Sequence, residues 1–244
     1  MKLTQLAALC ALSSAAVFAQ AKPVWQDFSL TALYGENYEV GTEQRTTLTG
    51  EYAAKYKYAD VFFFVDHQWD DHEDQNTYFE LAPRLSLSEV SGQNLSFGPV
   101  KDVLVATTWE HNAAYDNNQG FNNFLYGIGF ALDVPYTSYA NINFYKADNE
   151  RQKDDYQMTI TYAVPFKVGQ EDFLVDAFFD WSTAEGQGHA SELNWTSQYK
   201  WNVGKHISPQ TKLYVGVEHS IWNNKFGIKG MDQNDVSALV KYHF

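Results

Sequence analysis

The last ten residues of the chain alternate between apolar or small side chains and mostly polar ones. The first set is Val236, Ala238, Val240, Tyr242 and Phe244, and the odd-numbered positions from 235 to 243 form the second set. A β-strand places successive side chains on opposite faces, so this pattern predicts a strand with one apolar and one polar face. About ten residues is the length that a tilted strand needs to cross a bilayer. An edge strand of a soluble β-sandwich would show the same pattern, so the other stretches of the chain must distinguish the two.

Eleven more stretches show strand-like alternation, which indicates strands along the whole chain. They lie near residues 28–34, 46–58, 60–69, 78–87, 101–110, 122–133, 140–145, 156–164, 173–181, 192–201 and 213–221. Three features depart from the pattern. The stretch 61–65 is apolar on both faces and its sidedness stays unassigned, Pro83 lies inside a strand although proline cannot donate to the ladder, and His219 falls on an otherwise apolar face. Gly127 and Gly129, on the polar side of their strand, would widen the interior locally or admit a neighbouring side chain.

The connections between these stretches alternate in character. One set is acidic, rich in amides or glycine-containing, and the other is tighter or carries proline. The first set comprises 35–45, 67–76, 111–120, 147–154, 182–190 and 223–234, and the second comprises 57–60, 133–137, 165–172 and 203–210, with 88–100 as a long exception. Outer-membrane barrels join their strands by short periplasmic turns and longer external loops. The pattern therefore predicts an all-β fold, a twelve-stranded antiparallel transmembrane β-barrel with N- and C-termini on the periplasmic side.

The N-terminus has the form of a secretory signal peptide. Lys2 is followed by an apolar run and by small residues at Ala19 and Ala21, after either of which cleavage would fit. The only cysteine, Cys10, lies in this segment, so the mature chain would have no thiol for catalysis, for a disulfide or for a thiolate metal site. We therefore expect a signal peptide at 1–21 and a single barrel domain at 22–244.

Composition is consistent with a barrel and argues against several other classes. Aromatic residues make up 16% of the chain, and barrels need such residues in girdles at the two membrane interfaces. The mean hydropathy of −0.41 does not count against a barrel, because only the lipid-facing half of each strand must be apolar. Acidic residues outnumber basic ones by 30 to 17, so nucleic acid is not expected as a partner.

Two segments carry a resemblance to a known family. The first is E-x-x-P-R from Glu80 to Arg84, and the second is L-S-F-G-P-x-K from Leu95 to Lys101. Together with Glu51 and Lys55 they resemble the Tsx-type nucleoside-specific channels of Gram-negative outer membranes and their shorter OmpK-type relatives. The resemblance covers about residues 45–110 most clearly and is looser from there to the C-terminus. This chain has shorter loops than the enteric members, which affects the geometry of the entrance and hence the substrate range.

The resemblance implies a narrow monomeric barrel in the outer membrane that passes nucleosides and deoxynucleosides without any cofactor. In some relatives it also implies use as a phage or colicin receptor. Outer-membrane lipid and lipopolysaccharide are expected around such a barrel. The aromatic end of the final strand, at Phe244, resembles the signal that the barrel assembly machinery reads.

Inward-facing side chains are the candidates for contact with a solute. Aromatic rings can stack on a base, and carboxylates can accept hydrogen bonds from ribose hydroxyls. The stacking candidates are Tyr78, Tyr145, Phe178 and Tyr214, the hydroxyl acceptors are Glu51, Glu80, Asp176, Asp180 and Glu218, and the balancing cations are Lys55, Arg84 and Lys200. Any one of these charges could instead brace the lumen, and the aromatic residues could be mere filling.

Other functions remain as alternatives. The stretch 66–74, rich in Asp and His, could bind a divalent cation, although a solvated external loop is the simpler interpretation. Asp176 and Asp180 could form the carboxylate pair of a hydrolase. A membrane phospholipase would need a serine backed by histidine, and neither His219 nor His243 belongs to such a motif. A general small-solute porin and a surface receptor with little conductance complete the alternatives, and no chemical step is expected.

Overall fold

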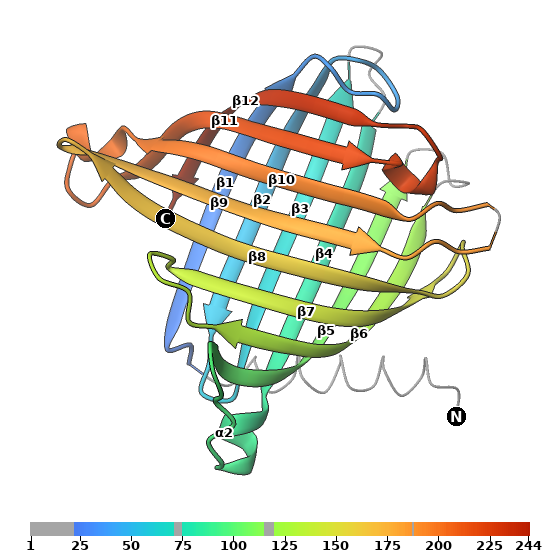
Figure 1. The fold of residues 1–244 in the computed structure, drawn as a ribbon. Helices are drawn as coiled ribbons and strands as arrows, with labels where there is room; N and C mark the ends of the chain where they lie inside the picture. The colour runs from blue at the N-terminus through green and yellow to red at the C-terminus, as the bar shows by residue number, and fades with distance from the viewer. Residues whose placement is uncertain (1–21, 71–74, 115–119, 187) are drawn as a thin grey trace.

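The computed structural model describes residues 22–70, 75–114, 120–186 and 188–244, so the predicted signal peptide lies outside the described residues. Twelve antiparallel strands follow one another around a closed barrel, and β1 pairs with β12 to close it (Figure 1). The strands are β1 (Trp25–Gly35), β2 (Arg45–Lys55), β3 (Ala59–Asp70), β4 (Gln75–Ser86), β5 (Val100–Ala114), β6 (Phe121–Leu132), β7 (Tyr139–Asn149), β8 (Asp155–Val168), β9 (Glu171–Ser182), β10 (Glu192–Asn202), β11 (Lys212–Asn223) and β12 (Gln233–His243). The predicted fold class is confirmed.

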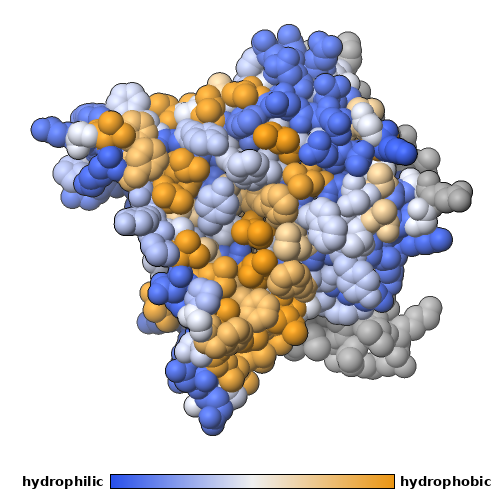
Figure 2. Space-filling model, in the orientation of Figure 1, coloured by the Kyte–Doolittle hydropathy of each residue, from blue (hydrophilic) through white to orange (hydrophobic). Residues whose placement is uncertain are grey.

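The two faces of each strand follow the alternation in the sequence. In β12, Ser237, Leu239 and Lys241 are buried in the interior, whereas Val236 and Val240 are exposed on the outside. Apolar residues gather over the strands on the outer surface, and strongly hydrophilic residues gather toward the ends (Figure 2). This is the arrangement that lipid around the wall requires, because the inner half of each strand need not be apolar.

Cross-strand pairing assigns the sidedness of β3, which the sequence pattern left open. Phe64 lies directly opposite Glu51 on β2 and Glu80 on β4. Residues that face each other across a ladder share a face of the sheet, so Phe62 and Phe64 point into the barrel with Glu51 and Glu80. Phe63, between them, points outward and packs its ring against Phe79, with the centroids 6.1 Å apart. The inward rings of β3 therefore belong to the lumen.

Pro83 and the inner glycines each have a local solution. The β4–β5 ladder pairs Leu81 with Trp109 and Arg84 with Ala106, and it leaves out Ala82 and Pro83 between them. Proline has no N–H to donate, so an interruption of the ladder is expected there. Gly129 admits a neighbouring side chain, as expected, because a Cβ there would overlap Asn143 Oδ1. Gly127 has a different role, since its Cβ would overlap the carbonyl oxygen of Phe144. The close approach of two backbones, rather than a wider lumen, requires glycine there.

We call the barrel end that carries Trp25 and His243 the terminal end, and the other the loop end. The predicted long connections all lie at the loop end and the tighter ones at the terminal end. Several strands extend further than the sequence indicated: β3 runs to Asp70 and β5 to Ala114, which shortens the loops expected at 67–76 and 111–120. The segment 165–172 is likewise not a loop, because β8 and β9 continue through it to a tight turn at Gly169 and Gln170. His219 does point outward, at the loop end, where its ring lies 2.7 Å from Asn234 Oδ1.

The long connection at 88–100 contains the one α-helix within the described ranges, α2 (Leu87–Ser91), which projects from the terminal end (Figure 1). Ser86 caps it by accepting a hydrogen bond from Glu89 N, and Gly92 ends it in the left-handed region at φ 69°. Two short 3₁₀ helices, η1 (Gly204–His206) and η2 (Lys225–Gly227), lie in the last two connections. Among the described residues, no helix has the length and apolarity needed to cross a membrane.

Candidate functional site in the barrel lumen

All twelve residues predicted to face the lumen lie on the inner face of their strands. Residues that lie opposite each other in neighbouring strands share a face of the sheet. Glu51, for example, lies opposite Ser29, and Asp176 lies opposite Gln198. The twelve residues do not form one cluster, however. One group joins into a charged network that spans β9, β10, β11, β12 and β2, another lines an acidic surface formed from β4 and β9, and Lys55 is exposed at the terminal end.

The network on the side of β9 to β12 is centred on two buried lysines. Lys200 Nζ lies 2.6 Å from Asp176 Oδ1, and its side chain is 0% exposed. Lys241, with 3% of its side chain exposed, forms an ion pair with Glu51. Both ammonium groups also donate to Gln198 Oε1, at 3.2 and 3.4 Å. Buried charges need such partners, so this network is a rigid, electrically balanced wall.

Gln198 extends this wall toward the loop end. Its amide Nε2 donates to Glu218 Oε2 at 2.9 Å, so one side chain joins both lysines to a further carboxylate. Lys241 was not among the predicted lumen candidates, although its position in the alternation of the final strand shows that it faces inward.

Arg84 forms a second brace with Asp60. Its Nε and Nη2 donate to the two carboxylate oxygens of Asp60 at 2.8 and 2.9 Å, and Nη1 donates to Asn143 at 3.4 Å. The two parallel bonds fix the planar guanidinium group against the β3–β4 wall. Arg84 thus has a partner within the wall, the arrangement that a bracing role would require.

Glu80, Glu110 and Asp180 face the lumen without a cation to balance them. Glu80 lies directly opposite Glu110 across the β4–β5 ladder, and Asp180 interacts electrostatically with both. Their hydrogen bonds come from neutral groups: Tyr78 Oη donates to Glu80 at 2.7 Å, Asn123 to Glu110 at 3.0 Å, and Thr159 to Asp180. Among the described residues none of the three forms an ion pair. We call Glu80, Glu110 and Asp180 the acidic wall.

A row of aromatic rings runs beside the acidic wall. The centroids of Phe62 and Phe64 are 5.9 Å apart, those of Phe64 and Tyr78 5.8 Å, and those of Tyr78 and Phe121 6.3 Å. Phe62 is 39% exposed, although it points inward, so its ring borders open space in the lumen. We call Phe62, Phe64, Tyr78 and Phe121 the aromatic row. Of these four rings, only Tyr78 was predicted from the sequence to face the lumen.

A signal for the missing rings was present in the sequence. Asp60, Asp66 and Gln68 have the same parity as Phe62 and Phe64, and polar residues of one parity mark the inner face of a barrel strand. The five consecutive apolar residues at 61–65 obscured this signal.

The other predicted stacking residues have different surroundings. Tyr145 is only 5% exposed and packs against Ala106, Leu125 and Ala147, so it offers little surface to a solute. Tyr214 lies at the terminal end, with its ring 5.5 Å from that of His243. Phe178 points inward between Thr161 and Thr196 and is partly exposed.

The predicted metal and hydrolase alternatives gain no support from the arrangement. No three His, Cys, Asp or Glu side chains of the described residues are grouped as metal ligands, and the part of the acidic stretch at 71–74 lies outside those residues. Asp176 and Asp180 lie on the same face of β9 but bind different partners, Lys200 and Thr159.

Known proteins resemble the chain in both sequence and structure. Residues 37–244 match the family described as "Nucleoside-specific channel-forming protein, Tsx". The chain is 30% identical over 224 residues to an outer membrane protein OmpK of Vibrio parahaemolyticus, covering 85% of this chain and 81% of that protein. It is 25% identical over 128 residues to the nucleoside-specific channel-forming protein Tsx of Klebsiella pneumoniae, covering 48% and 44% of the two chains.

Among solved structures, a KdgM porin superposes with a TM-score of 0.50 at 8% identity, over 88% of this chain and 99% of the porin. That likeness concerns the fold alone, and it agrees with a β-barrel porin architecture. The family match over most of the chain, the similarity to OmpK and the closed barrel lead to one assignment. The chain belongs to the Tsx family of channel-forming outer-membrane proteins.

Proposed function

We propose that the barrel binds nucleosides and deoxynucleosides weakly in its lumen and conducts them passively across the outer membrane. The observation that carries this proposal is the aromatic row beside the acidic wall. A nucleoside presents a flat base and a hydroxyl-rich sugar, and these two surfaces match a line of rings and a set of carboxylate acceptors. The similarity to the nucleoside-specific channel-forming protein Tsx of Klebsiella pneumoniae supports the same solute class.

The geometry supports simultaneous contact with both parts of the solute. Tyr78 belongs to the row and donates its hydroxyl to Glu80, so the row and the acidic wall meet at this pair. A base stacked on Phe64 or Tyr78 would bring the sugar next to Glu80 or Glu110. Stacking stabilises a base by about 1–3 kcal/mol, and a conducting site must stay this weak, because a solute that cannot leave blocks the pore.

The braced wall limits the roles of the remaining candidates. Lys200, Asp176, Arg84 and Glu51 have partners within the protein, so we assign them to the scaffold that holds the lumen open. Glu218 and Phe178 border the same space and remain secondary candidates for solute contact. No cofactor and no chemical step enter this function.

The test is conductance of the purified protein in planar bilayers. We expect open channels whose current falls on addition of adenosine or thymidine and is unchanged by the same concentration of glucose. Block by all three solutes, or by none, would identify a general small-solute pore. Absence of channels from correctly folded protein would favour a surface receptor for phage or colicin.

The remaining partners stay predictions. Phe244 is exposed beyond the end of β12 and packs its ring near Tyr242 and Phe28, at centroid distances of 4.9 and 5.2 Å, which leaves it accessible to the barrel assembly machinery. Contact with lipopolysaccharide is expected at whichever end faces the outside, and we propose that the terminal end is periplasmic.

A further inference from the structure

A tyrosine at the start of β7 borders the open space of the lumen. Tyr139 lies directly opposite Ala163 on β8, and Ala163 lies opposite Asp176 on β9, so all three share the inner face of the wall. Although its side chain points inward, Tyr139 is 43% exposed. The sequence pattern placed the start of this strand at residue 140, so Tyr139 was not among the predicted lumen residues. An inward ring with this much free surface lies beside the path of a solute.

Tyr139 lies below the rim of the barrel on the side of β8 and β9. β8 continues past Ala163 to Val168, and β9 begins at Glu171, so the wall extends beyond the level of Tyr139 toward the terminal end. The backbone is fixed at this level, because Ser138 N donates to Ala163 O at 2.8 Å immediately before the tyrosine. The ring is therefore presented to the lumen from an ordered position.

The charges around Tyr139 come from several sides of the barrel. Tyr139 interacts electrostatically with Asp176 on β9 and with Arg84 on β4. It also interacts with Glu51 on β2. In the closed order of strands, β9 lies to one side of β7, whereas β4 and β2 lie to the other. A side chain on β7 can be near all three charges only if it extends toward the barrel axis, so Tyr139 reaches toward the middle of the lumen.

The three charges that surround Tyr139 are held by partners in the wall. Asp176 is paired with Lys200, Glu51 with Lys241, and Arg84 with Asp60. The hydroxyl of Tyr139, in contrast, forms no hydrogen bond with another of the described residues. Its ring therefore borders the lumen on one side, and braced charges border it on the other.

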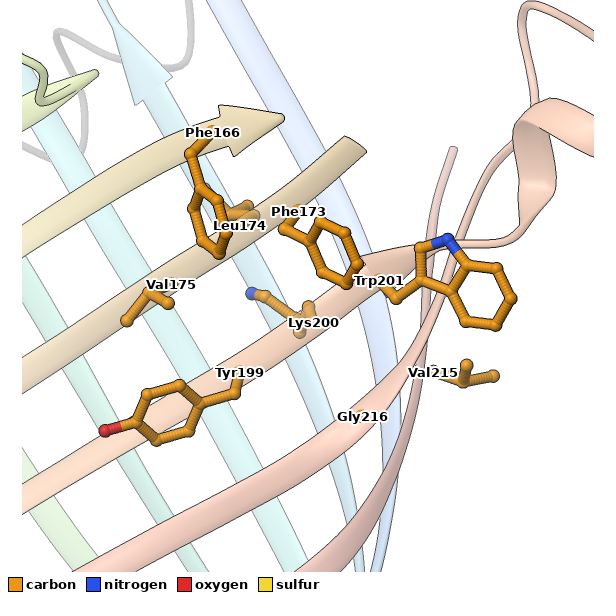
Figure 3. Close-up of a pocket in the computed structure, with 9 residues that line it drawn as sticks. All are labelled: Phe166, Phe173, Leu174, Val175, Tyr199, Lys200, Trp201, Val215 and Gly216. Carbon is orange, nitrogen blue, oxygen red and sulfur yellow. The ribbon is translucent and has the colours of Figure 1, made fainter. Parts of the chain in front are cut away.

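Lys200 illustrates how firmly that other side is held. Figure 3 shows Lys200 on β10 between Tyr199 and Trp201, whose rings lie on the outer surface of the wall. Its own side chain is 0% exposed and pairs with Asp176 in the interior. A buried charge that leaves its partner is costly, so this side of the lumen cannot easily widen to admit a larger solute.

We propose that Tyr139 forms the narrowest point of the lumen and limits the width of the solutes that can pass. Eight strands leave an interior filled by side chains and sixteen leave an aqueous channel, so with twelve strands the inward side chains decide the width. A solute of small cross-section passes beside the ring, whereas one that is broad in every direction is held back. This role concerns the width of the solute and not its chemistry, so it does not depend on nucleoside binding.

The test is single-channel conductance of the full barrel in planar bilayers, combined with exclusion of neutral polyethylene glycols of graded size. Tyr139→Ala removes the ring and should raise the conductance in KCl about two-fold and admit larger polymers, because pore diameter limits both. Tyr139→Phe keeps the ring and should leave both unchanged. Phe144→Ala is the matched control, because it shortens an aromatic side chain of the same strand that is 47% exposed on the outer face.

A second variant tests the opposite direction. Tyr139→Trp places a larger ring at the same point and should lower the conductance, and it decides the matter if heat-modifiable gel mobility shows that Tyr139→Ala does not fold. Wild-type conductance and polymer exclusion in Tyr139→Ala or, failing that, in Tyr139→Trp would overturn the proposal.

The width of the lumen and the choice of solute are tested separately. Indifference of the channel to adenosine would contradict the proposed function and leave the comparison of the Tyr139 variants valid. If the wild-type protein shows no channels, opening by Tyr139→Ala would support the proposal, and continued silence of that variant would overturn it.

Discussion

Lys200 and Asp176 form an ion pair in which the lysine side chain is more deeply buried than the aspartate. Lys200 Nζ lies 2.6 Å from Asp176 Oδ1. The side chain of Lys200 is 0% exposed, whereas that of Asp176 is 23% exposed. An uncompensated charge costs more where water cannot reach it. The wall of β9 to β12 therefore depends on the carboxylate more than on the ammonium group.

This asymmetry predicts a ranking of variants. Asp176→Asn leaves the buried ammonium of Lys200 without its anion and should lower the free energy of unfolding by about 3–5 kcal/mol. Lys200→Met leaves a carboxylate that water can still reach and should cost less. The combined variant should recover part of the loss. Urea unfolding of the refolded barrel in detergent measures all three, and an equal cost for the two single variants would contradict the assignment.

The loop end contains a lysine held in a buried position outside the membrane-spanning strands. Lys225 is 3% exposed, donates to Gln233 Oε1 at 2.6 Å and lies 4.7 Å from the centre of the Trp222 ring. Glu39 N donates to the same oxygen at 3.2 Å, so Gln233 connects the first loop to the last. Burial, and then the nearby Arg45, lower the pKa of Lys225 from 10.5 to about 8, against the opposing effect of Asp235 and Glu39.

This shift predicts a barrel that becomes more stable as the pH rises above 8. The folded state binds the Lys225 proton less tightly than the unfolded state does, so the charged ammonium group lowers the free energy of unfolding at neutral pH. This loss is recovered as the pH rises from 8 toward 10.5. The gain should be about 2 kcal/mol between pH 8 and pH 9.5. Tyr38 does not interfere in this window, because burial raises its pKa to about 12 and its opposite contribution begins only near pH 10.

Equilibrium unfolding at pH 8.0 and pH 9.5 measures this effect. Lys225→Met keeps most of the apolar stem without the charge and should remove the pH dependence, while Gln233 keeps its bond from Glu39. Lys229→Met, at an exposed position of the same loop, is the control and should behave as the wild-type protein does. A pH dependence that persists in Lys225→Met would assign it to other groups.

Gly216 should be intolerant of any side chain. Its Cβ would overlap backbone atoms of β10, which cannot move without breaking the ladder, so Gly216→Ala should cost at least about 3 kcal/mol or prevent folding. Gly188→Ala is the control, because a Cβ there would meet nothing within 4 Å. The heat-modifiable gel mobility of the folded barrel reports the outcome, and normal folding of Gly216→Ala would refute the close approach.

The acidic wall predicts a cation-selective pore. Glu80, Glu110 and Asp180 lack ion-pair partners among the described residues, and a ring of carboxylates favours cations in a narrow pore. The reversal potential in a KCl gradient should show this preference, and Glu80→Gln together with Glu110→Gln should reduce it. Glu43→Gln, in an exposed loop, should leave it unchanged. Anion preference in the wild-type protein would show that other charges control the pore.

The barrel itself was predictable because its evidence is local and repeated. In β12 the contrast between Val240 outside and Lys241 inside is visible in the sequence, and eleven further stretches support the same fold. The aromatic row was less accessible, since β3 carries rings on both faces and only its pairing with Glu51 and Glu80 distinguishes Phe64 from Phe63.

Partners within the lumen were the least predictable feature. Arg84 binds Asp60 on the neighbouring strand, and Tyr145 is buried in a cluster with Ala106, Leu125 and Ala147. Both outcomes depend on register and on the sizes of neighbours across the sheet, which alternation along one strand does not contain. The sequence pattern therefore identified which residues face inward but not which of them remain available to a solute.

The most direct test of the central claim compares two adjacent phenylalanines of β3. Phe64 belongs to the aromatic row inside the lumen, whereas Phe63 faces outward against Phe79. Adenosine block of the single-channel current should require about ten-fold more adenosine in Phe64→Ala, since loss of one stacking surface costs about 1–3 kcal/mol. In Phe63→Ala the blocking concentration should be unchanged. Equal blocking concentrations in Phe64→Ala and the wild-type channel would contradict nucleoside binding along the aromatic row.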